Sequence, residues 1–334
     1  MSTTTAASTS TGRRVKDAID LQDHYYVPDP ATRPLKSVNL REDYAHFTSE
    51  VYDQGDTKSC TANATAAAFW YEQKKAGHHL ETFGTAGPSR LFIYWLARGG
   101  YKDDSHLVAF PCDEGASVQE AMRGIGICGS CSETDWPFDP KNINVKPCQE
   151  AFDRAYSSKI RYFYRLNLDR PRSNKYRLKA EQKDKLGAVV LENLKCLTEQ
   201  YPVVFGLWYR LPSLESYDCD QMPWVLKDVW SLPDRKFPRH CFMDDLPEDL
   251  KIRNFCGEAI SPGHTVLAIG YDDDRQQVLI QNSRGSSWSE NGTFWMSYSW
   301  ITDYAATNDF WTIRSEPVAG AKERGDVHNE VLSS

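Results

Sequence analysis

DQGDTKSCTANA occupies residues 53–64, and the rest of the chain is organised around this stretch. The polar residues around Gly55 predict a loop, and the alanine-rich run 62–75 predicts a helix, because alanine loses no side-chain entropy in a helix. Cys60 is therefore expected where a loop enters a helix. The N–H groups at a helix start carry partial positive charge, which favours a thiolate there. The alternative is a free cysteine packed as a small hydrophobic residue.

Three other residues can form a catalytic group with Cys60. Gln54 lies six residues upstream, and its amide can hold a developing oxyanion together with the backbone N–H of Cys60. His264 begins an apolar strand directly after Gly263, and Asn282 ends the next one. Antiparallel strands can bring these ends together, so that the asparagine carbonyl accepts the imidazole N–H and fixes its tautomer. Each residue alone has an ordinary structural explanation, but the set of four indicates nucleophilic catalysis.

The composition limits the class of protein. The chain has 334 residues, 40% hydrophobic and 12% aromatic, which is enough for a core in one large domain or two halves. The net charge is −7 without a basic stripe, so nucleic acid is not an expected partner. No stretch approaches the ~20 apolar residues that span a bilayer, so we expect no membrane association. The sequence does not define the oligomeric state.

The cysteines and the N-terminus predict a cytoplasmic protein. Residues 1–14 are Ser/Thr-rich and then basic, and they lack the apolar segment of a secretory signal. Disorder is the expected state of this stretch, with a transit peptide as the alternative. The nine cysteines are an odd number, and without a secretory signal we expect reduced thiols.

Local patterns predict the remaining elements. Ser117 with Glu120 forms a capping-box pattern before a helix, and Pro88 begins another helix with an apolar face. Further expected elements are a helix at 183–200 and strands at 202–208, 264–271, 278–282, 294–297 and 310–313. Residues 211–261 between them are rich in proline and charge, which is typical of a lid, a binding loop or an insertion.

Two motifs suggest metals, and neither is complete. Cys128 and Cys131 have the spacing of a zinc or redox pair, but no second paired motif supplies the further zinc ligands. The aspartates at 272–274 suggest calcium, but the EF-hand pattern does not follow, which favours a solvated turn. We therefore predict no metal and no cofactor.

Four motifs resemble those of the papain-like cysteine peptidases. They are DQG at 53–55 followed by SC at 59–60, CDEG at 112–115, GHTV at 263–266, and NSRGSSWSENG at 282–292. The resemblance runs from about Leu35 to Ile313. It implies an α+β fold of two lobes, with a mainly helical lobe at 34–165 and a β-rich lobe at 166–315 that contains the 211–261 insertion. A flexible leader at 1–33 and a loose tail at 316–334 flank them.

The resemblance also implies a mechanism, in which Cys60 attacks a peptide carbonyl and His264 protonates the leaving amine. Asn282 would orient the imidazole, Gln54 would hold the oxyanion, and water would hydrolyse the acyl-enzyme. The peptide substrate would lie extended between the lobes. The residues expected to contact it are Glu114, Gly115, Gly263, Arg284 and Trp288.

The chain departs from the family pattern at several positions. Lys58 replaces a glycine, Thr61 replaces a tryptophan, and Arg284 replaces a tryptophan that would shelter the histidine–asparagine pair. Arg284 also brings a cation that opposes an imidazolium unless it turns outward. Thr57 replaces a cysteine that in secreted members would pair with the one matching Cys112, which agrees with a reducing compartment.

Three functions therefore remain open at this point. The first is a cysteine peptidase. The second is an acyl transferase or amide ligase on the same thiolate, in which an amine takes the acyl group and the insertion excludes water. The third is a silent homologue that binds peptides, which the changes at Lys58, Thr61 and Arg284 favour but the four retained reactive residues oppose.

Overall fold

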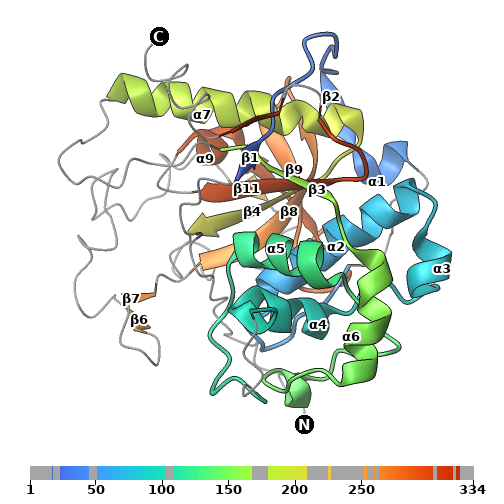
Figure 1. The fold of residues 1–334 in the computed structure, drawn as a ribbon. Helices are drawn as coiled ribbons and strands as arrows, with labels where there is room; N and C mark the ends of the chain where they lie inside the picture. The colour runs from blue at the N-terminus through green and yellow to red at the C-terminus, as the bar shows by residue number, and fades with distance from the viewer. Residues whose placement is uncertain are drawn as a thin grey trace.

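The computed structural model describes residue 17 and the ranges 23–44, 51–102, 108–167, 180–208, 225–226, 252–253, 259–260, 263–303, 307–318 and 321–323. Within them, a group of helices packs beside one large sheet (Figure 1). Almost all of the predicted insertion at 211–261 lies outside the described residues. No helix among the residues described is both long and apolar enough to cross a membrane.

The helical half follows the predicted order of helices. Ser117 caps its helix by accepting a hydrogen bond from the N–H of Glu120, as predicted. The elements are α1 (Leu40–Asp43), α2 (Cys60–Lys75), α3 (His79–Phe83), α4 (Arg90–Trp95) with a π-helical turn (Leu96–Gly100), α5 (Val118–Cys128), 3₁₀ turns at Pro140–Asn142 and Tyr156–Ser158, and α6 (Gln149–Ala155).

The sheet half is mostly antiparallel, and β8 lies near its middle, between β4 and β9. The strand order is β12-β1-β3-β11-β4-β8-β9-β10-β5, with β2 also paired to β8. The strands are β1 (His24–Tyr25), β2 (Ser37–Asn39), β3 (Tyr162–Arg165), β4 (Val203–Trp208), β5 (Val225–Leu226), β8 (Gly263–Asp272), β9 (Gln277–Gln281), β10 (Thr293–Ser297), β11 (Thr307–Arg314) and β12 (Lys322–Glu323). A separate pair is β6 (Ile252–Arg253) and β7 (Ala259–Ile260).

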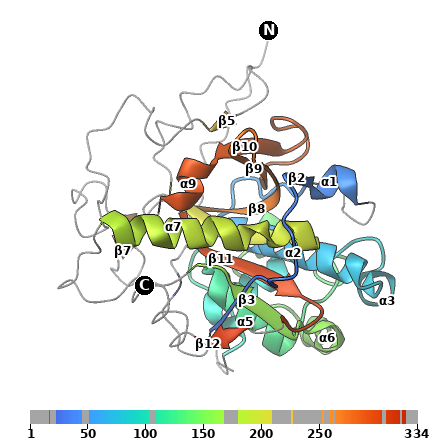
Figure 2. The same ribbon diagram turned by 90° about the horizontal axis from the view of Figure 1, so that it is seen from above.

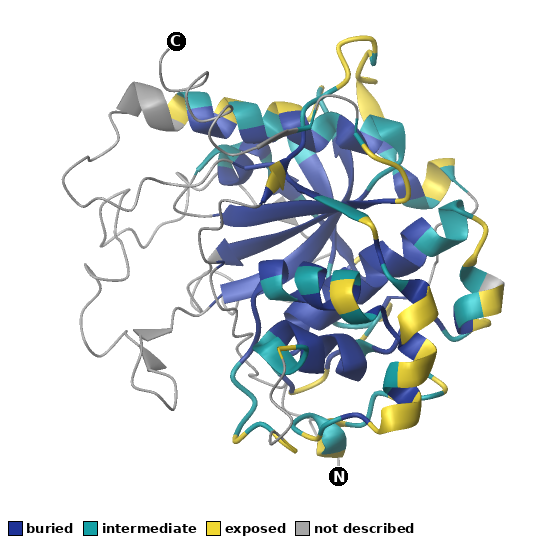
Figure 3. Cartoon of the chain, in the orientation of Figure 1, coloured by how far each residue is buried: buried dark blue, intermediate teal, exposed yellow. Residues whose placement is uncertain are grey.

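Helix α7 (Ala180–Leu194) crosses the side of the sheet opposite the helical half, where it packs on α9 (Tyr298–Thr302) (Figure 2). The predicted helix at 183–200 thus begins earlier and changes to a 3₁₀ turn at Lys195–Glu199. Figure 3 shows that the central strands and α2 are buried, whereas exposed residues lie on α6, along α7 and in the loops.

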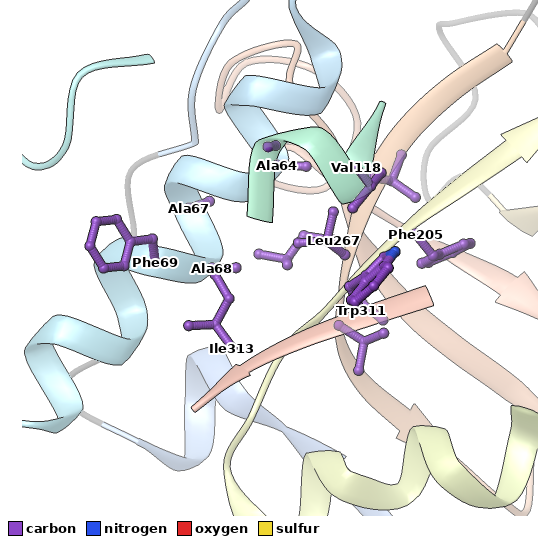
Figure 4. Close-up of a cluster of buried hydrophobic side chains, with 14 of the residues drawn as sticks. Ala64, Ala67, Ala68, Phe69, Val118, Phe205, Leu267, Trp311 and Ile313 are labelled. Carbon is purple, nitrogen blue, oxygen red and sulfur yellow. The ribbon is translucent and has the colours of Figure 1, made fainter. Parts of the chain in front are cut away.

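Helix α2 forms the junction between the two halves. It is buried from Cys60 through Glu72, and its alanines present little bulk to the sheet. Figure 4 shows Ala64 and Ala68 of α2 in the same buried cluster as Leu267 of β8. Because small side chains allow close approach of backbones, the alanine run lets the helix that begins with Cys60 pack directly against β8.

The described parts of the leader and the tail differ from the flexible segments that the sequence predicted. Strand β1 pairs with β12 and with β3, so residues of both termini extend the main sheet. Asp17 and Asp23 are buried and bind Arg165 and Trp311. These ion pairs and backbone hydrogen bonds join residues far apart in sequence, which composition alone does not reveal.

Candidate active site

The structure brings the start of α2 and the start of β8 together. Cys60 is the first residue of α2 and is fully buried, and His264 is the second residue of β8 and is 6% exposed. The hydroxyl oxygens of Thr61 and Thr265, the residues that follow them, lie 2.9 Å apart. The candidate nucleophile and the candidate base therefore each directly precede a threonine that contacts the other half of the molecule.

Asn282 fixes the tautomer of His264. Its Oδ1 lies 2.7 Å from Nε2 of His264 and accepts the backbone N–H of Ser283 at 2.8 Å. An amide oxygen only accepts hydrogen bonds, so Nε2 carries the proton. In the neutral ring, Nδ1 is then the basic nitrogen, and it is buried from solvent. This is the tautomer required of a base that takes a proton from Cys60.

The electrostatic environment favours a neutral imidazole. Burial lowers the pKa of His264 from 6.5 to about 4, the hydrogen bond to Asn282 raises it in part, and Arg284 lowers it further. A ring with so low a pKa carries no proton on Nδ1 at neutral pH. It can hold a proton there only if a negative charge, such as a thiolate, forms beside it.

Gln54 is held in one orientation by two hydrogen bonds. Its Oε1 accepts from the Ser283 hydroxyl at 2.5 Å, and its Nε2 donates to the carbonyl of Thr57 at 2.7 Å. The amide has two N–H groups, so one remains for a second acceptor. The backbone N–H of Cys60 lies in the first turn of α2, where N–H groups point out of the helix end.

The turn at 112–115 is fastened to the loop before Cys60. The backbone N–H of Lys58 donates to Oδ2 of Asp113 at 2.7 Å, and its Nζ donates to the Asp113 carbonyl at 2.8 Å. The N–H of Gly115 donates to the Tyr94 hydroxyl at 2.9 Å. The Gly115 N–H that the family resemblance offers to substrate is thus engaged inside the protein.

The other predicted substrate contacts lie at different depths. Gly263 is buried at the start of β8, opposite Trp208, and Glu114 is half-buried in the same turn as Gly115. Arg284 forms a backbone bridge with Asp53, which holds it beside the Gln54 loop. Trp288 is half-buried and packs edge-on against Phe294.

The motifs considered for metals have structural explanations. Cys128 and Cys131 are free thiols, and burial raises the pKa of both. The carboxylate of Asp272 accepts N–H groups of residues 274 and 275, as in an ordinary turn. Among the residues that the structure describes, no group of three or more histidine, cysteine or acidic side chains could hold a metal ion.

Two residues of the site had no predicted role. Ser283 connects Gln54 to Asn282, since its hydroxyl binds the first and its N–H binds the second. The sequence signal was its place directly after Asn282. Tyr94 supports the turn at 112–115, and the sequence indicated only that it falls within the helix predicted to begin near Pro88.

A helical half and a sheet half that meet at a cysteine on a helix start and a histidine on a strand start define the papain-like fold. Known proteins agree with this assignment, although no family model matches the chain. An uncharacterized peptidase C1-like protein from Acanthamoeba polyphaga mimivirus is 27% identical over 284 residues, covering 84% of this chain and 75% of the relative.

Solved structures show the same fold. Xylellain, a cysteine protease from Xylella fastidiosa, has a TM-score of 0.65 and 26% identity, covering 95% of this chain and 100% of that one. Digestive procathepsin L 3 from the larval midgut of Tenebrio molitor has a TM-score of 0.57 and 16% identity, covering 92% and 77%. The predicted α+β fold and the predicted resemblance to papain-like cysteine peptidases are confirmed.

Proposed function

We propose that this chain is a cysteine peptidase that hydrolyses peptide bonds through a thioester formed on Cys60. The observation that carries the proposal is the 2.7 Å contact between His264 Nε2 and Asn282 Oδ1. This contact commits the imidazole to one tautomer and leaves Nδ1 as its base. The mimivirus relative and xylellain support a peptidase as the class of enzyme.

In the first step, the proton of Cys60 moves to Nδ1 of His264 as sulfur attacks the carbonyl carbon of the scissile bond. A carbon–sulfur bond forms, and the carbonyl electrons move to oxygen. The low pKa of the buried ring means that the imidazolium depends on the adjacent thiolate. The ring therefore carries its proton as the partner of the Cys60 thiolate.

The oxyanion lies between the second N–H of Gln54 and the backbone N–H of Cys60 in this mechanism. The hydrogen bonds from Ser283 and to Thr57 hold the amide before substrate arrives. A donor that needs no reorientation stabilises developing charge most effectively. Collapse of the tetrahedral intermediate breaks the carbon–nitrogen bond, and His264 gives its proton to the leaving amine.

Water completes the cycle. His264 takes a proton from a water molecule, and the water oxygen attacks the thioester carbon. The carbon–sulfur bond then breaks, and the proton passes from His264 to the sulfur, which restores the thiol. The substrate in this proposal is an extended peptide that contacts the turn at 112–115. Since the N–H of Gly115 binds Tyr94, this N–H is not available to pair with the substrate unless that hydrogen bond breaks.

Mass spectrometry of the intact chain after incubation with a peptidyl epoxide tests the proposal. We expect one adduct, mapped to Cys60 by peptide analysis and lost in Cys60→Ala. Cys148 is exposed, so Cys148→Ala is the matched control, and its labelling should equal that of the wild type. A peptide-amide substrate should be hydrolysed by both of these proteins and not by Cys60→Ala.

The same experiment separates the alternatives. Absence of both product and adduct would exclude any catalytic role for Cys60 and leave peptide binding. Product diverted to an added amine at low concentration would instead support an acyl transferase. Turnover retained in Cys60→Ala would show that another residue is the nucleophile.

A further inference from the structure

Thr61 stands where three parts of the site meet. It follows Cys60 in α2, and its hydroxyl donates to the carbonyl of Ala116, next to the turn at 112–115, at 3.0 Å. The same oxygen lies 2.9 Å from the hydroxyl of Thr265, which follows His264 in β8. Both threonines are fully buried.

The direction of these hydrogen bonds follows from counting protons. A hydroxyl has one hydrogen, and a carbonyl oxygen only accepts. Because Thr61 gives its hydrogen to Ala116, the shared contact requires Thr265 to donate to Thr61. The result is a directed chain from β8 through α2 to the turn, and threonine's branched Cβ restricts rotation of both hydroxyls.

We propose that Thr61 and Thr265 are positioning residues that set the alignment of the Cys60 sulfur with the His264 imidazole. The inference rests on the proposed function and assigns a role to residues outside the reacting group. Each hydroxyl lies one residue from a reacting side chain, so a slip of α2 along β8 stretches this bond as it changes the sulfur–imidazole distance. The bond thus opposes the motion that most directly disturbs proton transfer.

The pH dependence of alkylation tests this role. Iodoacetamide is small and does not depend on the peptide-binding surface, and peptide mapping assigns the product to Cys60 among the nine cysteines. We expect Thr61→Val to lower the alkylation rate at pH 6 about tenfold and to move the acid limb to higher pH, because thiolate forms less readily beside a misaligned imidazole. Thr61→Ser keeps the hydroxyl and should recover the wild-type profile within about twofold.

The two valine variants should differ in stability. Thr61→Val removes the hydrogen bonds of Thr61 to both Thr265 and Ala116, whereas Thr265→Val leaves the bond from Thr61 to Ala116 intact. Thr61→Val should therefore lose more stability, and Thr265→Val should shift the alkylation profile in the same direction by less. The double variant should match Thr61→Val in its alkylation profile, since the one contact between the two threonines is lost only once.

Thr312→Val is the control for a merely structural effect. Thr312 is fully buried, and its hydroxyl donates to the carbonyl of Pro202 at 3.2 Å, so this variant also loses a buried hydrogen bond. Its alkylation profile should equal that of the wild type. Unchanged profiles in Thr61→Val and Thr265→Val would overturn the inference, and if Thr61→Val does not fold, Thr265→Val decides alone. Wild-type protein unreactive at Cys60 at every pH would instead overturn the proposed function.

Discussion

The active site and the cluster around Arg165 both bury polar groups between segments that are distant in sequence. Arg165 is 1% exposed, with Nη1 at 2.9 Å from Asp23 and Nη2 at 3.0 Å from Asp309. Burial raises the pKa of Asp23, and the charge of Arg165 offsets part of that rise. Asp17 completes the cluster through Trp311 Nε1 at 2.7 Å.

His264 is buried in surroundings that disfavour a positive charge on its ring. Its Nε2 is hydrogen-bonded to the neutral amide of Asn282, and Arg284 opposes a positive charge on the ring. In the cluster around Arg165, opposite charges already face each other. In the proposed mechanism, the imidazole gains an opposite charge beside it only when Cys60 gives up its proton. The difference separates a buried polar group that holds the fold from one that is prepared for proton transfer.

The largest expected effect is on the structural side of this comparison. Arg165→Met should lower the free energy of unfolding by about 3–5 kcal/mol, because it leaves buried carboxylates without their partner. Urea unfolding measures the change. Arg154→Met is the control: Arg154 pairs with Asp135 but is 67% exposed, so its loss should cost about 1 kcal/mol or less. Equal losses in the two variants would contradict the role given to the cluster.

Removal of the oxyanion donor should produce the largest change on the catalytic side. Gln54→Ala should reduce kcat/KM for a peptide-amide substrate about 10²- to 10³-fold. It should also lower the urea midpoint, because the buried amide loses its hydrogen bonds to Ser283 and Thr57. Ser283→Ala keeps the amide but removes the hydroxyl that fixes its oxygen, so we expect a smaller loss. Activity retained in Gln54→Ala would mean that the oxyanion is stabilised elsewhere.

The same contrast explains what the sequence predicted. Cys60 and His264 could be placed because each sits at a local boundary, a helix start or a strand start, which residue patterns reveal. The meeting of these boundaries required one further assumption, antiparallel neighbours, and the sheet order contains such neighbours. The catalytic roles of the four residues stay predictions until the labelling experiment.

The Arg165 cluster could not be predicted in this way. Asp23 and Arg165 lie 142 positions apart, and no local pattern marks either as buried. A charged residue in a polar leader is normally solvated, so the sequence favoured a flexible segment there. Tyr94 illustrates the same limit, because its hydroxyl partners, Asp113 and Gly115, depend on tertiary packing.

The unusual pKa of His264 predicts how acid affects stability. In Cys60→Ala no thiolate can share the proton, and the folded pKa of about 4 lies below the ordinary 6.5. Between these values the unfolded chain binds more protons, so stability should fall as the pH falls from about 6.5 to 4, by about 3 kcal/mol. Unfolding curves of Cys60→Ala and Cys60→Ala/His264→Gln across this range measure it. If the unfolding free energies of the two variants change in parallel with pH, the imidazole is not desolvated in the folded protein.

Arg284 allows the smallest and most specific test. Its charge lowers the pKa of His264, so Arg284→Gln in the Cys60→Ala background should raise the pKa of that ring, as followed by NMR titration of the imidazole. The effect should be modest because Arg284 is only half-buried, and it should shrink in high salt, which screens a partly solvated charge. Arg275→Gln is the control, since Arg275 pairs with Asp272, the last residue of β8, at the opposite end of the strand from His264, and should leave the titration unchanged. A rise in the pKa that does not shrink in high salt would mean that Arg284 acts by shielding the ring from water, as the family's tryptophan would, and that its charge is secondary.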